Sequence, residues 1–499
     1  MLTLVMSFFQ LGKGLLSLYV LVLSASLFGA GIGRDAWVLG WAVQLFFFKL
    51  FFGPVNETVR ARYIHLEEEK GRDHALKSFA ALVLWCSCIG VVIVSVAYLR
   101  AGWLAHWFAP GISDPADQAQ VVQLIRLLLP NILLGELITL FTALLNAGKT
   151  FVLPELFALF SLLLNVVLLL FAAPYLGIYT LVLSNYLSAG LLLLLLGLAL
   201  YRRRLSLRLR WPGWRLVRPY FLFALPFYIS YSAGQINAWA ERALSTMLGI
   251  GNTTVLDYAR KFIDLPLAVL ISVAVSVMSP LLASLWVRGE KENFRKEFFV
   301  FFRMALLLLF PVIVLFLVCP QEIISFFLLR GRFDTAWLPA AAQTLLFLGC
   351  VLPGVALYIL CGQLLVVQQK AGIYAALSVV TQLLPVVLNA LFYRRFGLPF
   401  FAISWGLAHY VSGCLMFGLG KIWDRQQVLQ LLLLVLVLLL SLGLCLLAYG
   451  YTVYLGPLSR IVAIALVCGL SLLVLMYLFR MQEFEMFKRR WKPFFRSDE

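Results

Sequence analysis

The sequence predicts an all-α polytopic membrane protein with about 14 transmembrane helices. Hydrophobic residues make up 63% of the 499 residues and charged residues only 13%, which leaves too little polar surface for a water-soluble chain. Apolar runs of about 20 residues, the length that crosses a bilayer core of roughly 30 Å, recur along the whole chain. A membrane β-barrel would show alternating segments of about ten residues instead.

The first apolar run covers residues 10–30. It contains Ser24-Ala25-Ser26, which resembles the small-residue cleavage site of a signal peptide. Only one basic residue, Lys13, stands at its start, and the run leads directly into a glycine-containing motif. We therefore interpret it as the first transmembrane helix.

The later apolar runs form two groups of six helices, counting the first, and a final pair. We predict an N-terminal lobe (residues 1–201), a basic cytoplasmic linker (202–219), a C-terminal lobe (220–425), helices 13 and 14 (426–480) and a basic cytoplasmic tail (481–499).

The second half of the chain repeats the first at an offset of about 220 residues. The matching positions are Pro130 with Pro353, Lys149 with Lys370, Asn165 with Asn389, and Gly177 with Gly397. Because the offset spans an even number of helices, the two lobes are expected to be parallel repeats rather than inverted ones.

The distribution of lysine and arginine predicts the orientation. The N-terminus, the even-numbered loops and the tail hold 27 of these residues, whereas the odd-numbered loops hold seven. Basic loops stay on the cytoplasmic side, so both termini are expected in the cytoplasm. This bias and attraction to anionic lipids account for the net charge of +17, so we expect no nucleic-acid partner.

Few patterns suggest catalysis or a bound metal. The eight cysteines lie within or beside apolar runs and are interpreted as small core residues. The segment Gly148-Lys149-Thr150 resembles the end of a phosphate-binding loop, but Ala143 replaces the required glycine. Glu136 and Glu155 are too isolated to count as a catalytic pair. We expect no enzyme activity and no cofactor. Any energy that the protein needs is expected from coupling to Na⁺ or H⁺, from the membrane potential or from a partner.

Charged residues inside the predicted helices are the candidates for function, since each costs roughly 2.5–3.5 kcal/mol at a helix centre. They are Lys49 and Glu57 in predicted helix 2 (residues 36–58), Glu136 in helix 4 (121–147), Glu155 in helix 5 (151–173), Glu241 and Arg242 in helix 7 (221–248), and Arg260, Lys261 and Asp264 in helix 8 (255–284). Their spacing lets either cation of helix 8 share a face with the carboxylate of Asp264. This cluster is either neutralised internally or forms a cationic wall for a diphosphate. We expect no pairing between Glu241 and Arg242, because adjacent residues point apart on a helix.

Several of these segments also carry a family resemblance, from about Phe28 to about residue 425. The landmarks are Phe28-Gly29-Ala30-Gly31 with Asp35-Ala36, Ala109-Pro110-Gly111-Ile112, Leu145-Asn146 with Phe151, Pro154 and Asn165, the stretch Tyr258 to Pro266, and Arg330-Gly331-Arg332-Phe333-Asp334. In this order and at these positions, the chain resembles MurJ-type lipid II flippases (the MviN family) of the MOP exporter superfamily.

The resemblance implies two lobes arranged in a V around a central cationic cavity, which opens alternately to each side of the membrane. It implies that the last two helices form a groove for the lipid tail. Asp35, Lys261 and Asp264 match charged positions that function in the family, and Lys49 lies at or beside a functional arginine. Arg260 adds a third cation to the expected cavity. Glu241 and Asn389 match a cation site that some members have.

The chain also departs from the family pattern. The arginines of helix 1 are missing, and the family's Pro-Asn-Leu-Leu-Arg-Arg in helix 2 is replaced by Gln44 to Lys49. Lysine stands for arginine at Lys261, which keeps the charge but loses bidentate binding of phosphate.

The leading hypothesis is a flippase that moves an undecaprenyl-diphosphate-linked cell-wall precursor, lipid II first, from the cytoplasmic to the outer leaflet. An O-antigen or exopolysaccharide flippase is the alternative within the superfamily. A cation-coupled multidrug antiporter is a weaker one, because a wall formed by Lys49, Arg260 and Lys261 would repel cationic drugs. The expected partners are the lipid-linked glycan, membrane lipids and the cell-wall synthesis machinery.

Overall fold

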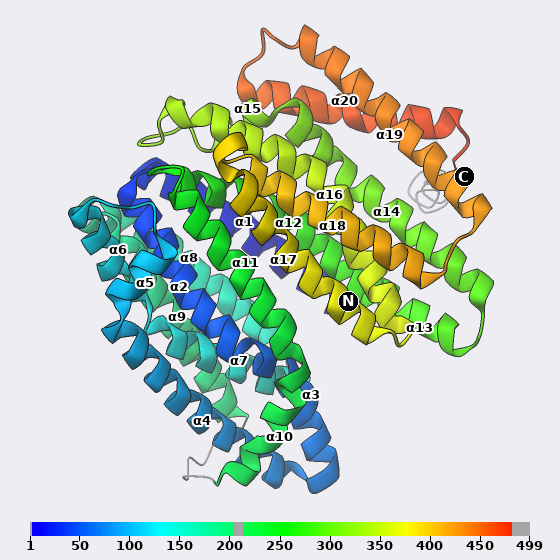
Figure 1. Cartoon of the computed structure of the whole chain (residues 1–499). Helices are drawn as coiled ribbons and strands as arrows, with labels where there is room; N and C mark the ends of the chain where they lie inside the picture. Colours follow the sequence, from blue (N-terminus) through cyan, green and yellow to red (C-terminus); the bar gives the residue numbers. More distant parts are fainter. Residues whose placement is uncertain (1, 204, 206–212, 482–499) are drawn as a thin grey trace, which may run out of the picture. The chain divides into compact units, whose positions relative to one another are not determined.

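The computed structural model describes residues 2–203, 205 and 213–481, and within them the chain forms helices and turns without a strand (Figure 1). The helices are α1 (Leu2–Phe28), α2 (Ile32–Phe51), α3 (Gly53–Lys70), α4 (Arg72–Leu99), α5 (Ala101–Phe108), α6 (Pro115–Leu128), α7 (Asn131–Ala147), α8 (Val152–Leu176), α9 (Tyr179–Arg202), α10 (Trp214–Ala224), η1 (Leu225–Phe227), α11 (Tyr228–Thr246), α12 (Asn252–Val273), η2 (Ala274–Met278), α13 (Ser279–Val287), α14 (Lys291–Val318), α15 (Pro320–Phe327), η3 (Thr335–Trp337), α16 (Leu338–Val367), α17 (Ala371–Phe396), α18 (Phe400–Gly420), α19 (Arg425–Tyr451) and α20 (Pro457–Leu478). The predicted all-α class is confirmed.

Among the described residues, eleven segments, or twelve if α2 and α3 form one bent span, are long and apolar enough to cross a membrane. Three of these segments join consecutive elements: α6 with α7, α12 with η2 and α13, and η3 with α16. The other predicted spans fall short for local reasons. The apolar part of α1 is limited to Gly12–Phe28. Predicted helix 7 is divided by η1 into α10 and α11, and α11 carries Glu241 and Arg242. The number 14 therefore stays a prediction.

The repeat is visible in matching helix ends. Helices α7, α8 and α9 correspond to α16, α17 and α18, and a residue with positive φ follows the first helix of each set, Lys149 (φ 57°) and Gln369 (φ 60°). Gly177 and Gly397, which follow α8 and α17, have φ of 54° and 66°. Glycine reaches this left-handed region without steric cost, so both repeats break their helices at equivalent places.

The helices form two compact units. The first contains residues 1–261 with Arg330–Asp334 and Asn389–Gly397, and the second contains Phe262–Leu329, Thr335–Leu388 and Leu398–Glu499. The predicted linker 202–219 lies partly outside the described residues, and α10 begins within it at Trp214. The predicted tail lies outside them except for Met481. The domain boundaries stay predictions.

The core of the first unit packs α2 to α7 closely together. Helix α2 lies against α6, and α3 contacts α4, α7 and α10. Its most buried side chains are aliphatic and aromatic, such as Leu39, Phe52 and Phe79. A Cβ at Gly40 would lie 3.1 Å from the backbone of Leu124, so this glycine allows α2 and α6 to approach closely.

In the second unit, α19 and α20 pair with each other and pack on α14 and α15 (Figure 1). Buried polar contacts join both helices of this pair to α14 and α15. The Arg303 guanidinium of α14 donates to Gln427 Oε1 of α19 at 3.0 Å. Glu322 of α15, which is 7% exposed, pairs with Arg460 of α20 and accepts from the Tyr449 hydroxyl at 2.7 Å.

We expect Glu322→Ala to weaken the docking of α20, because Arg460 would keep its charge without a carboxylate. Removing one partner of a buried pair costs about 3–5 kcal/mol, and the partial exposure of Arg460 (14%) places the effect at the lower end. Thermal unfolding of the purified protein measures it. The double variant Glu322→Ala/Arg460→Met should recover part of the loss, and additive effects of the two changes would contradict a direct interaction.

Candidate functional site

The site begins at the turn between α1 and α2. Gly29 has φ of 64°, and Gly31 is extended before the first residue of α2. This turn places Arg34 and Asp35 in the first turn of α2, and both side chains are buried, at 5% and 1% exposed. Two adjacent buried charges require partners, because an unpaired charge inside a protein is costly.

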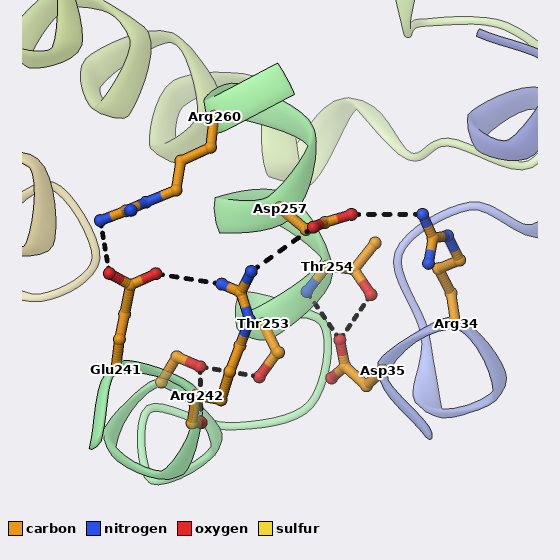
Figure 2. Close-up of polar contacts among 9 residues, drawn as sticks. Arg34, Asp35, Glu241, Arg242, Thr253, Thr254, Asp257 and Arg260 are labelled. Carbon is orange, nitrogen blue, oxygen red and sulfur yellow. Dashed lines mark hydrogen bonds and ion pairs between the residues drawn. The ribbon is translucent and has the colours of Figure 1, made fainter. Parts of the chain in front are cut away.

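Asp35 finds its partners at the start of α12. Its carboxylate accepts from the backbone N–H of Thr254 at 2.8 Å and from the Thr254 hydroxyl at 2.5 Å (Figure 2). It also accepts from the backbone N–H of Gly251 at 2.5 Å. The first N–H groups of a helix have no partner within the helix, and a carboxylate there also interacts favourably with the helix dipole. Asp35 therefore caps α12 from a different helix.

Arg34 points to the same helix. Its guanidinium pairs with Asp257 at 3.3 Å, and its Nε donates to the hydroxyls of Ser24 at 3.0 Å and Tyr258 at 3.3 Å. The guanidinium also lies 4.4 Å from the centroid of the Trp37 ring, a distance that allows a cation–π interaction. These contacts fix Arg34 between α1, α2 and α12.

An alternating series of charges continues from Asp257 (Figure 2). Arg242 of α11 lies 3.6 Å from Asp257 and 3.0 Å from Glu241. The other oxygen of Glu241 pairs with Arg260 of α12. The series runs Arg34, Asp257, Arg242, Glu241 and Arg260, which places three guanidinium groups against two carboxylates.

The expectation that Glu241 and Arg242 do not pair was wrong. Their Cα–Cβ bonds do point apart, but the arginine side chain is long enough to reach both Glu241 and Asp257. Similarly, the partner shown for Arg260 is Glu241 of α11, whereas the sequence argument considered only Asp264 on its own helix. Contacts between helices cannot be read from spacing within one helix.

The remaining predicted cations and their carboxylate lie at more accessible positions. Lys261 directly follows Arg260 and is exposed, as is Asp264 further along α12. Lys49 is exposed near the end of α2, and the described residues include no ion pair for it. Their role in binding stays a prediction.

The two residues of the predicted cation site lie in the first unit. Asn389 is 1% exposed in α17, and Glu241 has a guanidinium against each of its oxygens. A cation bound to Glu241 would have to displace one of these arginines. The described part of the chain contains no cluster of three His, Cys, Asp or Glu side chains that could hold a metal ion.

Sequence reasoning missed Arg34, Thr254 and Asp257 as members of the site. For Asp257 a signal existed, because it lies three residues before Arg260 and therefore shares a helix face with it. Arg34 could have been noticed as a basic residue within the first turn of an apolar helix. Thr254 gave no signal, since a helix-capping contact from a distant segment leaves no local pattern.

Two of the sequence landmarks pack closely within this unit. The N–H of Arg332 donates to the carbonyl of Ser26 at 2.9 Å, and a Cβ on Gly331 would lie 2.2 Å from that carbonyl oxygen. The N–H of Gly111 donates to the Thr246 hydroxyl at 3.1 Å, and its Cβ would lie 2.2 Å from the Thr246 carbonyl oxygen. Both glycines are required by a close approach of two backbones.

Comparison with known proteins identifies the family. The family model described as lipid II flippase MurJ matches residues 24–492, which is nearly the whole chain. The chain belongs to the MurJ family. The resemblance inferred from the landmarks is thereby confirmed, and the membership of a multi-span transporter family agrees with the helical membrane fold.

Curated relatives of the MurJ family are distant in sequence. A protein of Buchnera aphidicola described as a probable lipid II flippase MurJ is 23% identical over 317 residues, covering 61% of this chain. The alignment spans 61% of the length of that relative. The lipid II flippase MurJ of Burkholderia cenocepacia is 23% identical over 414 residues, covering 80% of this chain and 79% of its own.

Solved structures show the same fold. A lipid II flippase MurJ in an inward closed conformation has a TM-score of 0.80 at 18% identity and covers 96% of this chain and 98% of its own. An inward-facing multidrug resistance transporter of the MATE family, in the MOP superfamily, has a TM-score of 0.69 at 15% identity, covering 82% and 94%. At such identities the likeness establishes the fold alone.

Proposed function

We propose that this chain moves lipid II from the cytoplasmic to the outer leaflet of a bacterial inner membrane by alternating access, without a catalytic reaction. Its membership of the MurJ family supports this function. Among the residues, the charge series that ends at Arg260 supports it most directly. This series has more guanidinium groups than carboxylates, and Lys261 is exposed beside it. A diphosphate is the part of the substrate that such cations attract.

Within this proposal, Lys49, Arg260 and Lys261 bind the diphosphate. Asp264 sets the positions of the cations on α12 through its charge. Asp35 acts as a positioning residue, since its carboxylate is occupied by the start of α12. The lysines act as point charges, whereas an arginine would offer a fixed pair of donors.

The topology proposed with this function places both termini in the cytoplasm, because the basic residues concentrate in the loops on that side. The N-terminal lobe (1–201) and the C-terminal lobe (220–425) would move against each other, and helices 13 and 14 (426–480) would receive the lipid tail. The cell-wall synthesis machinery is the proposed protein partner, as the supplier and consumer of the substrate.

A strain depleted of its own lipid II flippase tests the proposal. The wild-type chain should restore growth, whereas Lys49→Ala and Lys261→Ala should not, because each removes a cation from the diphosphate site. Lys77→Ala is the matched control, since Lys77 is an exposed lysine at the start of α4. Expression and membrane insertion are measured by immunoblotting of each variant.

Three results would contradict this proposal. Failure of the wild-type chain together with export of another lipid-linked glycan would favour the O-antigen or exopolysaccharide flippase. Growth of Lys49→Ala and Lys261→Ala at the wild-type rate would exclude the proposed cation site. Resistance to cationic drugs on overexpression, without rescue, would favour the multidrug antiporter.

A further inference from the structure

Helix α7 carries a buried acid that the charge series does not include. Glu136 is 2% exposed in an otherwise uncharged helix from Asn131 to Ala147. Ionisable residues inside a membrane bundle are rare and costly, and they commonly mark ion or proton pathways. Glu136 therefore requires either a partner or a function that explains its position.

The contacts of Glu136 come from polar but uncharged groups. The Asn56 amide of α3 donates to Oε2 at 2.9 Å, and the Cys86 thiol of α4 faces the carboxyl. The second oxygen, Oε1, is buried without a hydrogen-bond partner, as is Oδ1 of Asn56. Within the described residues, Glu136 forms no ion pair.

Among the described residues, no lysine or arginine of a neighbouring helix pairs with Glu136. Helix α2 places Phe48 beside Gly135 of α7, and the following residue, Lys49, is exposed and does not pair with Glu136. Tyr228 of α11 is the other titratable group in the surroundings. Its hydroxyl donates to the Phe51 carbonyl at 3.0 Å.

A carboxylate in this setting would lack the partners that a buried charge needs, so the neutral acid is the form that the site accommodates. A metal ion fits less well. Hard divalent cations take about six or more oxygen ligands, whereas the side chains of Glu136 and Asn56 supply oxygens from only two residues. The chemistry of the site is that of a single proton.

The contact between Glu136 and Asn56 lies beside a bend. Helices α2 and α3 meet at 44° around Phe52, and Asn56 is in the first turns of α3. The next residue, Glu57, accepts from the Tyr231 hydroxyl of α11 at 3.1 Å, and a Cβ on Gly53 would lie 2.5 Å from the Tyr231 ring. Movement of α3 away from α7 would thus change its contacts with α11, the helix that carries Glu241 and Arg242.

We propose that Glu136 is a proton-binding site whose loading and release are coupled to transport. Because the carboxyl is enclosed between α3, α4 and α7, a proton can leave only when α3 separates from α7 and admits water. The neutral acid stabilises the packed state, and the carboxylate stabilises the separated one. The coupling rests on the proposed lipid II transport, whereas the proton site itself does not.

Infrared difference spectroscopy tests the proton site without substrate. In pH-difference spectra of the protein in lipid nanodiscs, the wild type should show the C=O stretching band of a buried carboxylic acid. Glu136→Gln should lose this band, and Glu68→Gln should keep it, because Glu68 is an exposed acid on α3. A band of unchanged intensity in Glu136→Gln would overturn the proton site.

A second variant tests the same site in case Glu136→Gln does not fold. Asn56→Ala keeps the acid and removes its donor, so the band should remain and shift to higher frequency, as a carbonyl does when it loses a hydrogen bond. An unshifted band in Asn56→Ala would contradict the contact between Asn56 and the protonated acid.

Proteoliposomes containing lipid II test the coupling. An imposed pH gradient should accelerate exposure of lipid II by the wild type, and Glu136→Gln should lose this acceleration. Retained acceleration in Glu136→Gln would overturn the coupling. Absence of lipid II transport by the wild type would reject the proposed function and the coupling, while the infrared band would still decide whether Glu136 holds a proton.

Discussion

Asparagine at position 35 should lower the free energy of unfolding by about 3 kcal/mol and abolish growth of the depleted strain. The Asp35 carboxylate accepts three hydrogen bonds from Gly251 and Thr254. Hydrogen bonds to a charged group contribute about 1.5–3 kcal/mol each, and an asparagine would direct NH₂ hydrogens at donors on α12. Thermal unfolding and growth complementation measure the two effects.

Two further variants provide stability losses with which that of Asp35→Asn can be compared. Thr254→Val removes the hydroxyl donor but keeps the backbone N–H, so its loss of stability should be smaller than that of Asp35→Asn. Asp73→Asn is the control, because Asp73 is an exposed acid in the first turn of α4. If Asp35→Asn were as stable as Asp73→Asn, the capping of α12 by Asp35 would have no energetic importance.

Much of the fold was predictable because the bilayer restricts the options. A chain with repeated long apolar runs must satisfy its backbone within helices, so the all-α class followed from composition. The positions of the helix breaks in the two repeats also agree, as at Gly177 and Gly397. These features depend on local sequence and on a constraint that acts equally on every span.

The helices that were harder to recognise carry the polar interactions. Helix α11 contains Gln235, Asn237, Glu241 and Arg242, which lower its apolar character below that of a simple span. Their cost is offset by partners on other helices, and apolarity within one segment does not reveal such partners. The same property that makes α11 a candidate functional helix makes it a weak transmembrane signal.

The candidate site was predictable in part for a related reason. Charges in apolar surroundings could be found by inspection, and Arg260 and Glu241 were found in this way. Their pairing depends on how α11 and α12 approach each other, as does the pairing of Arg242 with Asp257. Asp35 was identified only through the family resemblance, and its capping role became clear only when α12 was seen beside it.

Asn in place of Asp257 should have the second large effect, because this carboxylate lies between two arginines. Its loss would leave Arg34, which is 5% exposed, without its ion-pair partner, and Arg242 with Glu241 alone. Removing one member of a buried pair costs about 3–5 kcal/mol. The Trp37 ring beside Arg34 offsets a small part of this cost. We therefore expect the free energy of unfolding, measured by thermal unfolding, to fall by about 3 kcal/mol.

A double-mutant cycle separates the contribution of the pair from that of each residue. Arg34→Met combined with Asp257→Asn removes the stranded guanidinium, so the double variant should be more stable than Asp257→Asn alone. Additive losses would contradict the pairing of Arg34 with Asp257. If the double variant regains stability but does not support growth, the charges act in transport as well as in folding. If it regains both, the part of the series formed by Arg34 and Asp257 is structural, and the cations that act in transport are Lys49, Arg260 and Lys261.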